Sequence, residues 1–324
     1  MKRFIFIVSL IAFAYVLAVG LQPLQAQPYP SHPIQLVIPG APGDAADISA
    51  RMVVEELARI LKVPIIPVNK PGGGASVATD FVAKGKKDGY TLLYALSSAL
   101  IYGPAMNPES VPYDPLRDVE PLGMHVNFPG VLSVQADSPW KNLADVVEYS
   151  RKNPGKFRCG SLGIGAITHF QLEIIKSITG ADITYIPFKG ASPAVTALLG
   201  GHIESTNVAV VLSRPHFKSG KLRGILLDMK VPDLPDIPTL RDLGYPQDLP
   251  ASWFGFFAPS GIPEAAKQAL VPALEKAINH PEVVAKLQNL SYITNYKTPA
   301  ELKQILLENH EKIGAMAKKM GLAK

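Results

Sequence analysis

Two glycine-rich turns, each placed between a predicted buried strand and a predicted helix, constrain this chain more than any other feature. The first turn spans Pro39–Asp47 after the apolar run Ile34–Ile38, and the second spans Gly160–His169 after the run that begins at Phe157. At such a turn the first N–H groups of the helix have no backbone partner and the positive end of the helix dipole faces outward, so the turn favours an anion. Two such turns, about 120 residues apart, predict a cleft that grips a small anion from both sides.

Residues 1–26 have the features of a secretory signal peptide: two basic residues, an apolar run over 4–19, and the small residue Ala26 at the end. We expect cleavage near Ala26 and export of the remaining chain. A membrane anchor is the alternative, although the apolar run is barely long enough to span a bilayer. The single cysteine, Cys159, lies far from this segment, so neither lipid attachment at the new N-terminus nor an internal disulfide is expected.

Length and charge narrow the class of protein. Just under 300 residues remain after the signal segment, which is more than one compact core usually covers, so two domains are expected. Removal of Lys2 and Arg3 takes the formal charge from +5 to +3, and no basic run stands out. Binding of nucleic acid is therefore not expected. A hydrophobic content of 47% excludes general disorder.

The chain from 33 to 127 alternates short apolar runs with helical stretches, which is typical of parallel strands joined by crossover helices. The expected strands are 34–38, 63–68 and 91–95, and the expected helices are 47–61 and 75–84. A second alternating set begins near Gly130. Its expected strands are 131–134, 157–161, 183–187 and 223–228, and its expected helices are 143–152, 170–178 and 193–199.

The C-terminal part begins with the dense apolar strand Trp253–Ala258 and continues as helices over 263–279, 281–288 and 299–319. These helices need a surface to cover, so the simplest arrangement returns the chain to the first domain, with crossings near Asn127 and Ala251. We therefore predict an α/β protein of two lobes, each a doubly wound sheet with flanking helices. Residues 27–127 plus 251–324 form lobe 1, residues 128–250 form lobe 2, and the two crossings make a hinge with a ligand site between the lobes.

Nucleotide and metal sites are not expected. Neither the glycine and lysine pattern of a phosphate-binding loop nor the full dinucleotide-binding glycine pattern occurs, although Gly163 and Gly165 match the start of the second. The seven histidines are scattered singly, without the spacing of metal ligands. We expect no metal and no cofactor.

A hydrolase would use Cys159, Ser161 and His169. The segment Cys159–Gly163 misses the nucleophile-elbow pattern at its first position, which requires a small residue. His169 falls in the first turn of the expected helix, where the dipole lowers its basicity. We expect Cys159 to be a buried strand residue, and His169 either to cap or pack against the helix or to contact a ligand.

The groups that the two turns contain are suited to binding a ligand without chemical turnover. The glycines let the backbone approach a ligand closely, Ser161 and Thr168 add hydroxyl groups, and the helix starts add oriented N–H groups. Donors without a nucleophile indicate capture. For either turn alone, a tight connection in which the glycines only adopt positive φ is an equally good explanation, and the presence of two matching turns favours binding.

Nine motifs in order along the mature chain resemble the Bug family, the periplasmic solute-binding components of tripartite tricarboxylate transporters. The matching segments are Pro42–Gly43 with Asp47–Ile48, Val68–Gly74, Asp88–Leu93, Pro112–Pro115, Asn153–Lys156, Gly160–Ser161 with Gly163, Gly165 and His169, Pro187–Gly190, Leu198–Gly201 and Trp253–Gly255.

The resemblance implies a two-lobed periplasmic binding fold of the second type, no catalysis, and a small carboxylate, or occasionally an amide, enclosed between the lobes. It also implies a periplasmic location and delivery of the ligand to membrane permease subunits, and we expect a monomer. The residues that it places at the ligand are Gly40, Ala41, Pro42, Gly43, Asp44, Ala45, Ala46, Asp47, Ser97, Ser98, Ser161, Gly163, Gly165, Ala166, Thr168, His169 and Asn207. For Ser97 and Ser98, capping of a helix is an equal alternative.

Two departures from the family pattern, and one aromatic residue at the first crossing, concern the ligand. Asp44 stands in a stretch that is usually a run of glycines, and we expect its carboxylate to point either to solvent or at a hydrogen-bond donor of the ligand. The strand after Gly201 usually carries an acidic residue followed by asparagine, whereas here Val208 and Ala209 follow Asn207. Phe128 adds an apolar wall at the first crossing, which suits an aliphatic or aromatic acid or seals the hinge.

Two other functions stay open at this point. A periplasmic hydrolase would use Ser161 and His169 to turn over esters or amides. A ligand-sensing subunit would bind the same kind of acid but present it to a signalling kinase instead of a permease. Backbone amides recognise a carboxylate without recording the group attached to it, so the turns do not name the acid.

Overall fold

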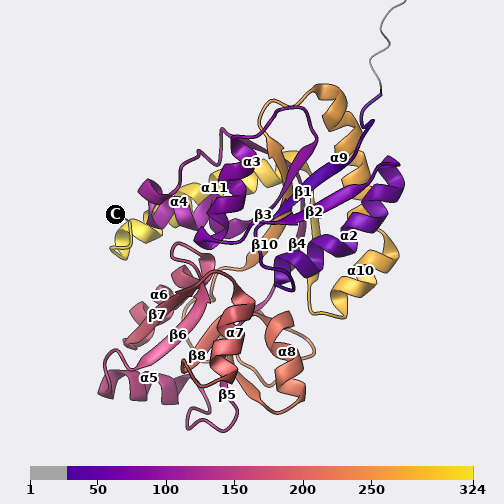
Figure 1. The fold of residues 1–324 in the computed structure, drawn as a ribbon. Coiled ribbons are helices and arrows are strands. Elements are labelled where there is room, and N and C mark those ends of the chain that lie inside the picture. Colours follow the sequence, from indigo (N-terminus) through magenta and orange to yellow (C-terminus); the bar gives the residue numbers. More distant parts are fainter. Residues whose placement is uncertain (1–27, 324) are drawn as a thin grey trace, which may run out of the picture.

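The structure, a computed structural model, describes residues 28–323. Two β-sheets, each flanked by helices, form two lobes joined by two chain segments (Figure 1). We use first lobe for the part built on the six-stranded sheet and second lobe for the part built on the five-stranded sheet. The expected signal peptide lies outside the described residues. Within 28–323, no helix has the length and apolar character needed to cross a membrane.

The sheet of the first lobe has the strand order β11-β4-β10-β3-β1-β2. Strand β1 pairs in parallel with β2 and β3, while β10 is antiparallel to β3 and β4, and β11 is antiparallel to β4. The strands are β1 (Ile34–Ile38), β2 (Ile65–Asn69), β3 (Thr91–Leu96), β4 (Val119–Phe128), β10 (Ser252–Pro259) and β11 (Ile293–Lys297).

Helices cover both faces of this sheet because successive strand residues point to opposite sides. Val37 belongs to the same buried cluster as residues of α3 and α11, whereas Leu36 and Ile38 belong to the cluster that contains residues of α2 and α9. The helical segments of the lobe are α2 (Ala45–Leu61), η1 (Gly73–Ala75), α3 (Ser76–Ala83), η2 (Ser98–Tyr102), α4 (Gly103–Met106), η3 (Pro108–Ser110), α9 (Glu264–Ile278), α10 (Pro281–Gln288) and α11 (Pro299–Lys319).

The sheet of the second lobe has the order β7-β6-β8-β5-β9, with β6 parallel to β7 and β8, and β5 antiparallel to β8 and β9. Its strands are β5 (Gly130–Gln135), β6 (Phe157–Leu162), β7 (Ile183–Phe188), β8 (Ser205–Ala209) and β9 (Leu222–Leu227). Its helices are α5 (Leu143–Lys152), α6 (Ile167–Thr179), α7 (Ala191–Leu199) and α8 (Val210–Lys218). Phe157 and Cys159 pack under α5 and α6, whereas Val208 packs under α7.

The buried side chains of Asp228 and Gln171 link the two chain crossings. Only Pro129 separates β4 from β5, and the amide of Gly130 donates to Oδ1 of Asp228 at 2.8 Å. Nε2 of Gln171 donates to Oδ2 of Asp228 at 3.0 Å and to the carbonyl of Pro250, beside the second crossing, at 2.7 Å. Burial raises the pKa of Asp228 to about 7, although the bonds from Gly130 and Gln171 oppose that rise.

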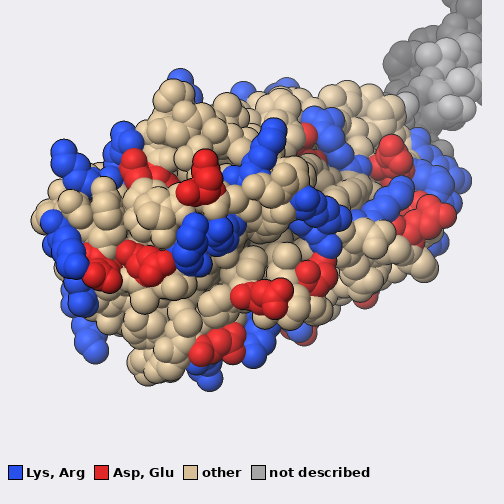
Figure 2. Space-filling model, turned by 90° about the horizontal axis from the view of Figure 1, so that it is seen from below, with Lys and Arg blue, Asp and Glu red and all other residues tan. Residues whose placement is uncertain are grey.

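The expected alternation of strands and helices is confirmed, and several elements had no expectation. These are the long strand β4, the helix α8, the strand β11 and the segment η2–α4. Both sheets are also mixed, whereas the alternation suggested parallel pairing throughout. On the face seen in Figure 2, Lys and Arg side chains are interspersed with Asp and Glu, so this face carries no large field of one sign.

We expect Asp228 to make stability depend on pH. Its pKa in the folded protein, about 7, exceeds that of an unfolded aspartate, about 3.9, so its contribution is complete below about pH 4 and is lost as the pH rises to about 7. The slope is at most about 1.4 kcal/mol per pH unit. Urea unfolding at several pH values should show that wild type loses stability relative to Asp228→Asn as the pH rises through this window.

The control for this experiment is Asp242→Asn. The pKa of Asp242 is lowered to about 2, chiefly by the backbone bond from Thr239, so this variant should differ from wild type in its pH dependence only below about pH 4. A constant difference between wild type and Asp228→Asn from pH 4 to pH 8 would contradict the role assigned to Asp228.

Candidate functional site

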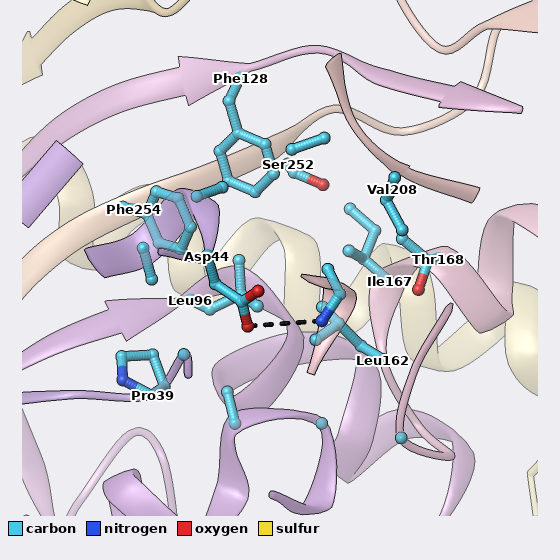
Figure 3. A pocket seen from close by; sticks show the side chains of 18 of the residues that line it. Pro39, Asp44, Leu96, Phe128, Leu162, Ile167, Thr168, Val208, Ser252 and Phe254 are labelled. Atoms are coloured by element: carbon cyan, nitrogen blue, oxygen red, sulfur yellow. Dashed lines mark hydrogen bonds between the residues drawn. The ribbon is translucent and has the colours of Figure 1, made fainter. Parts of the chain in front are cut away.

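A cavity lies between the two lobes, at the carboxyl ends of β1, β3, β6 and β8 (Figure 3). Ligands of open α/β sheets bind at this end of the strands. The cavity volume is about 40 Å³, which exceeds the minimum needed to hold a water molecule. The lining residues are Pro39, Gly40, Asp44, Ala45, Ala46, Gly72, Gly74, Ala75, Leu96, Phe128, Leu162, Gly163, Ile167, Thr168, Lys189, Ala191, Val208, Ala209, Ser252 and Phe254.

Helix α2 begins at the cavity. Ala45 and Ala46, its first two residues, line the cavity, and helix geometry leaves their N–H groups without intrahelical partners. The preceding turn needs Gly43 at φ +80°, a conformation that favours glycine. Asp47 holds the turn by accepting from the amide of Gly43 at 3.0 Å and from Nε of Arg51 at 2.7 Å. Burial opposes the charge of Asp47, but these bonds and one from Asn69 keep its pKa below the usual value.

Helix α6 begins on the opposite side of the cavity. Its first amide, that of Ile167, donates at 2.9 Å to the hydroxyl of Ser98, which belongs to the first lobe. Thr168, the second residue, lines the cavity, and its N–H has no intrahelical partner. Oγ1 of Thr168 accepts from Ser161 at 2.9 Å, and Asn207 donates to the carbonyl of Thr168 at 3.4 Å. Ser161 and Asn207 therefore support the helix start from behind the cavity surface.

Asp44 corrects the expectation for its side chain. Asp44 is 3% exposed, and its carboxylate is bonded to donors of the protein itself instead of facing solvent. It accepts from the backbone amide of Ser192 at 2.8 Å and from that of Ala191 at 3.3 Å (dashed in Figure 3), both at the start of α7 in the second lobe. The hydroxyl of Ser192 and the amide of Ala41 also donate to it. The bare N-terminus of α7 attracts the carboxylate because it offers several aligned donors.

The two lobes also meet backbone to backbone. A Cβ added to Gly163, in the turn before α6, would lie 2.9 Å from the amide nitrogen of Gly74 in the first lobe. A Cβ added to Gly74 would in turn lie 3.3 Å from the backbone of Ala166. Glycine at both positions therefore permits the approach that encloses the cavity.

One wall of the cavity is apolar. Figure 3 shows Phe128 and Phe254 on one side and Thr168 and Val208 on the other. The rings of Phe128 and Phe254 stack at 4.4 Å with 16° between their planes. The lining also includes the hydroxyl-bearing Ser252, and Lys189 is an exposed lining residue. A few polar groups within a mostly apolar pocket are typical of small-molecule sites.

The predicted site residues divide into two groups. Six line the cavity: Gly40, Asp44, Ala45, Ala46, Gly163 and Thr168. The others lie outside its lining: Ala41, Pro42, Gly43, Asp47, Ser97, Ser98, Ser161, Gly165, Ala166, His169 and Asn207. Several of these hold the loops, since Ser98 caps α6 and the hydroxyl of Ser97 accepts from the amide of Trp253 at 3.4 Å.

Sequence reasoning missed three parts of the lining. Gly72–Ala75 follows β2, next to β1 in the sheet, so its place at the carboxyl edge was a usable signal. Lys189 and Ala191 follow β7 in the same way. The aromatic and aliphatic wall had a weaker signal, because among its members only Phe128 was expected from the sequence to form an apolar wall.

Ser161 and His169 are not arranged as a nucleophile and its base. The hydroxyl of Ser161 donates to Thr168 and to the carbonyl of Asn207. The ring of His169 faces the amide of Gly165 at 3.4 Å, and burial lowers its pKa although Glu173 opposes that shift. Cys159 is fully buried, as expected, and burial raises the pKa of its thiol to about 12. Within 28–323, no group of three or more acidic, histidine or cysteine side chains has the arrangement of a metal site.

We expect Gly163→Ala to hold the lobes apart. The new methyl group would press on the backbone of Gly74, and overpacking of this kind typically costs about 1–3 kcal/mol. Small-angle X-ray scattering should report a larger radius of gyration than for wild type. Gly314→Ala is the matched control, since an added Cβ there meets nothing within 4 Å; equal scattering curves for Gly163→Ala and this control would contradict the predicted contact.

Comparison with known proteins gives the family. The chain matches the family described as tripartite tricarboxylate transporter family receptor over residues 49–322. Protein BugT of Bordetella pertussis is 31% identical over 304 residues, with 92% of each chain covered. The periplasmic binding protein BugD superposes with a TM-score of 0.86 at 28% identity, covering 91% of this chain and 100% of that one. An R. palustris protein solved with adipate gives 0.85 at 26% identity, covering 91% and 99%. The chain therefore belongs to the tripartite tricarboxylate transporter receptor family, as a periplasmic solute-binding protein of the Bug type.

Proposed function

We propose that this protein captures a small organic acid between its lobes and delivers it to the membrane permease subunits of a tripartite tricarboxylate-type transporter. One observation carries the proposal: the starts of α2 and α6, one from each lobe, face the same cavity. Ala45, Ala46 and Thr168 bring N–H groups that lack intrahelical partners, and each helix start adds about half a positive charge. Together these groups suit a carboxylate.

The two connections between the sheets support a hinge. We propose that residues 27–127 plus 251–324 move as one lobe and residues 128–250 as the other, about the crossings at Pro129 and Pro250. Hinged closure around a ligand needs only a few residues that absorb the change in backbone angles. The contacts of Ser98 with Ile167 and of Gly163 with Gly74 then belong to the closed form.

The site supports binding without catalysis. Its polar lining consists of backbone amides, Thr168, Ser252, Asp44 and Lys189. Ser161, the nearest candidate nucleophile, donates its hydroxyl to acceptors of the protein itself. The fold is shared with the adipate-bound protein of R. palustris, which supports an acid as the ligand class.

A thermal-shift screen over monocarboxylates, dicarboxylates, amides and amino acids tests the proposal. A ligand that binds the folded protein raises the unfolding temperature in proportion to RT ln(1 + [L]/Kd). We expect the largest shift from a small acid, with no consumption of ligand when the mixture is analysed after incubation. No shift with any acid, or release of a product, would contradict the proposed function.

The amide donors can be tested with Ala45→Pro. Proline suits the first position of a helix, and Asp44 before it has φ −73° and ψ 164°, which a following proline favours. The substitution removes the N–H of a residue that lines the cavity and leaves its carbonyl, which accepts from the hydroxyl of Tyr292. A hydrogen bond to a charged group contributes about 1.5–3 kcal/mol, so we expect the affinity for the best acid to fall about ten-fold or more by isothermal titration calorimetry.

Ala45→Gly is the control for this variant, because it also removes the methyl group but retains the N–H. We expect it to bind the acid with nearly wild-type affinity. Equal affinities for Ala45→Pro and Ala45→Gly would show that this amide does not contact the ligand.

A further inference from the structure

The carboxylate of Asp44 has no acceptor capacity left for a ligand. Oδ1 accepts from the amide and the hydroxyl of Ser192, and Oδ2 accepts from the amides of Ala41 and Ala191. An ionised carboxylate offers about four lone-pair sites, so these four donors use all of them. Asp44 lies in the loop before α2 in the first lobe, and three of the four donors to its carboxylate belong to the second lobe.

Among residues 28–323, the acceptor at the N-terminus of helix α7 is the carboxylate of Asp44 alone. Gly190, its own capping residue, supplies no side-chain bond. The missing side chain of Gly190 also matters sterically, because a Cβ there would lie 2.8 Å from Oδ2 of Asp44. Both lobes therefore contribute to this contact. The first lobe supplies the carboxylate, and the second supplies the uncapped start of the nine-residue helix α7.

Charge around the cavity limits what else can enter. Three helix starts, those of α2, α6 and α7, converge there, and each contributes about half a positive charge. Asp44 already places one full negative charge among them. The remaining positive potential suits one carboxylate, while a second would meet Asp44 in a confined, largely apolar space. Lys189 is exposed, so solvent screens its charge.

We infer that Asp44 takes the place of a ligand carboxylate at the start of α7, so that the lobes close without a ligand and the cavity selects acids with one carboxylate over those with two. The ligand class rests on the proposed function, whereas the closure of the free protein does not. An apolar wall that includes Phe128 and Phe254 then receives the uncharged part of the acid.

The first arm of the test uses the ligand-free protein. Asp44→Ala removes the contact from the first lobe, and Gly190→Ala obstructs it from the second. The side chain of Asp44 makes no capping hydrogen bond to its own helix, so Asp44→Ala removes no such bond from α2. We expect both variants to show a larger radius of gyration than wild type by small-angle X-ray scattering, with unchanged helix content by circular dichroism.

Asp47→Asn is the matched control for this arm. Asp47 lies in the first turn of the same helix and is equally buried, but its partners Gly43, Arg51 and Asn69 all belong to the first lobe. We expect this variant to lose stability while its scattering curve stays that of wild type. If Asp44→Ala and Gly190→Ala both fold and give the scattering curve of wild type, the inference that Asp44 holds the lobes closed is wrong.

The second arm uses acids of equal carbon number, butyrate against succinate and hexanoate against adipate, in isothermal titration calorimetry. We expect wild type to bind the monoacid of a pair at least about ten-fold more tightly than the diacid, and Asp44→Ala to narrow that ratio about ten-fold. A preference of wild type for the diacid, or an equal ratio in the variant, would overturn the selection by Asp44.

The two arms separate the inference from the proposed function. If no acid binds to any variant, the proposed function and the ligand class both fail, and the scattering arm alone still decides whether Asp44 closes the lobes. If acids bind but scattering and selectivity do not respond to Asp44, the proposed function stands and the inference fails.

Discussion

The structure depends on the first amides of two helices in one lobe, which donate hydrogen bonds to side chains of the other lobe. A helix leaves its first amides without partners, and a buried amide without an acceptor costs free energy. In the second lobe, the first amide of α6 reaches Ser98 and the first two amides of α7 reach Asp44, both in the first lobe. Hydrogen bonds between the lobes therefore fix the position of one lobe against the other, and each of these bonds needs a donor from one lobe and an acceptor from the other.

Under the proposed function, the cavity combines two kinds of recognition that act on different parts of an acid. Amides at the starts of α2 and α6 would then recognise the charge and the direction of a carboxylate, whatever group it is attached to. The wall formed with Phe128, Phe254 and Val208 reads size and shape, because close-packed interiors respond even to single methylene groups. Selectivity among acids must therefore come from the wall and from the carboxylate of Asp44, which lies within the same lining.

The sequence was sufficient for the elements whose signals are local. Helices α5, α10 and α11 were predicted with the bounds that the structure has, since each shows its periodicity and its boundary residues within a short window. Strand β4 was missed because Gly123 and Pro121 interrupt its pattern, and its pairing with β10 is a long-range contact. The glycine turns located the two sides of the cavity, but the destination of Asp44 was not predictable, because Ser192 lies 148 residues away along the chain.

Helix α6 connects the cavity to the two chain crossings within less than one turn. Thr168 lines the cavity, and Gln171, three residues later, holds both Asp228 and the carbonyl of Pro250. Three residues of helix span about 4.5 Å. The same helix therefore lines the cavity at Thr168 and, through the side chains of Gln171 and Asp228, bonds to both chain crossings, so a small tilt of the helix would move the two crossings together.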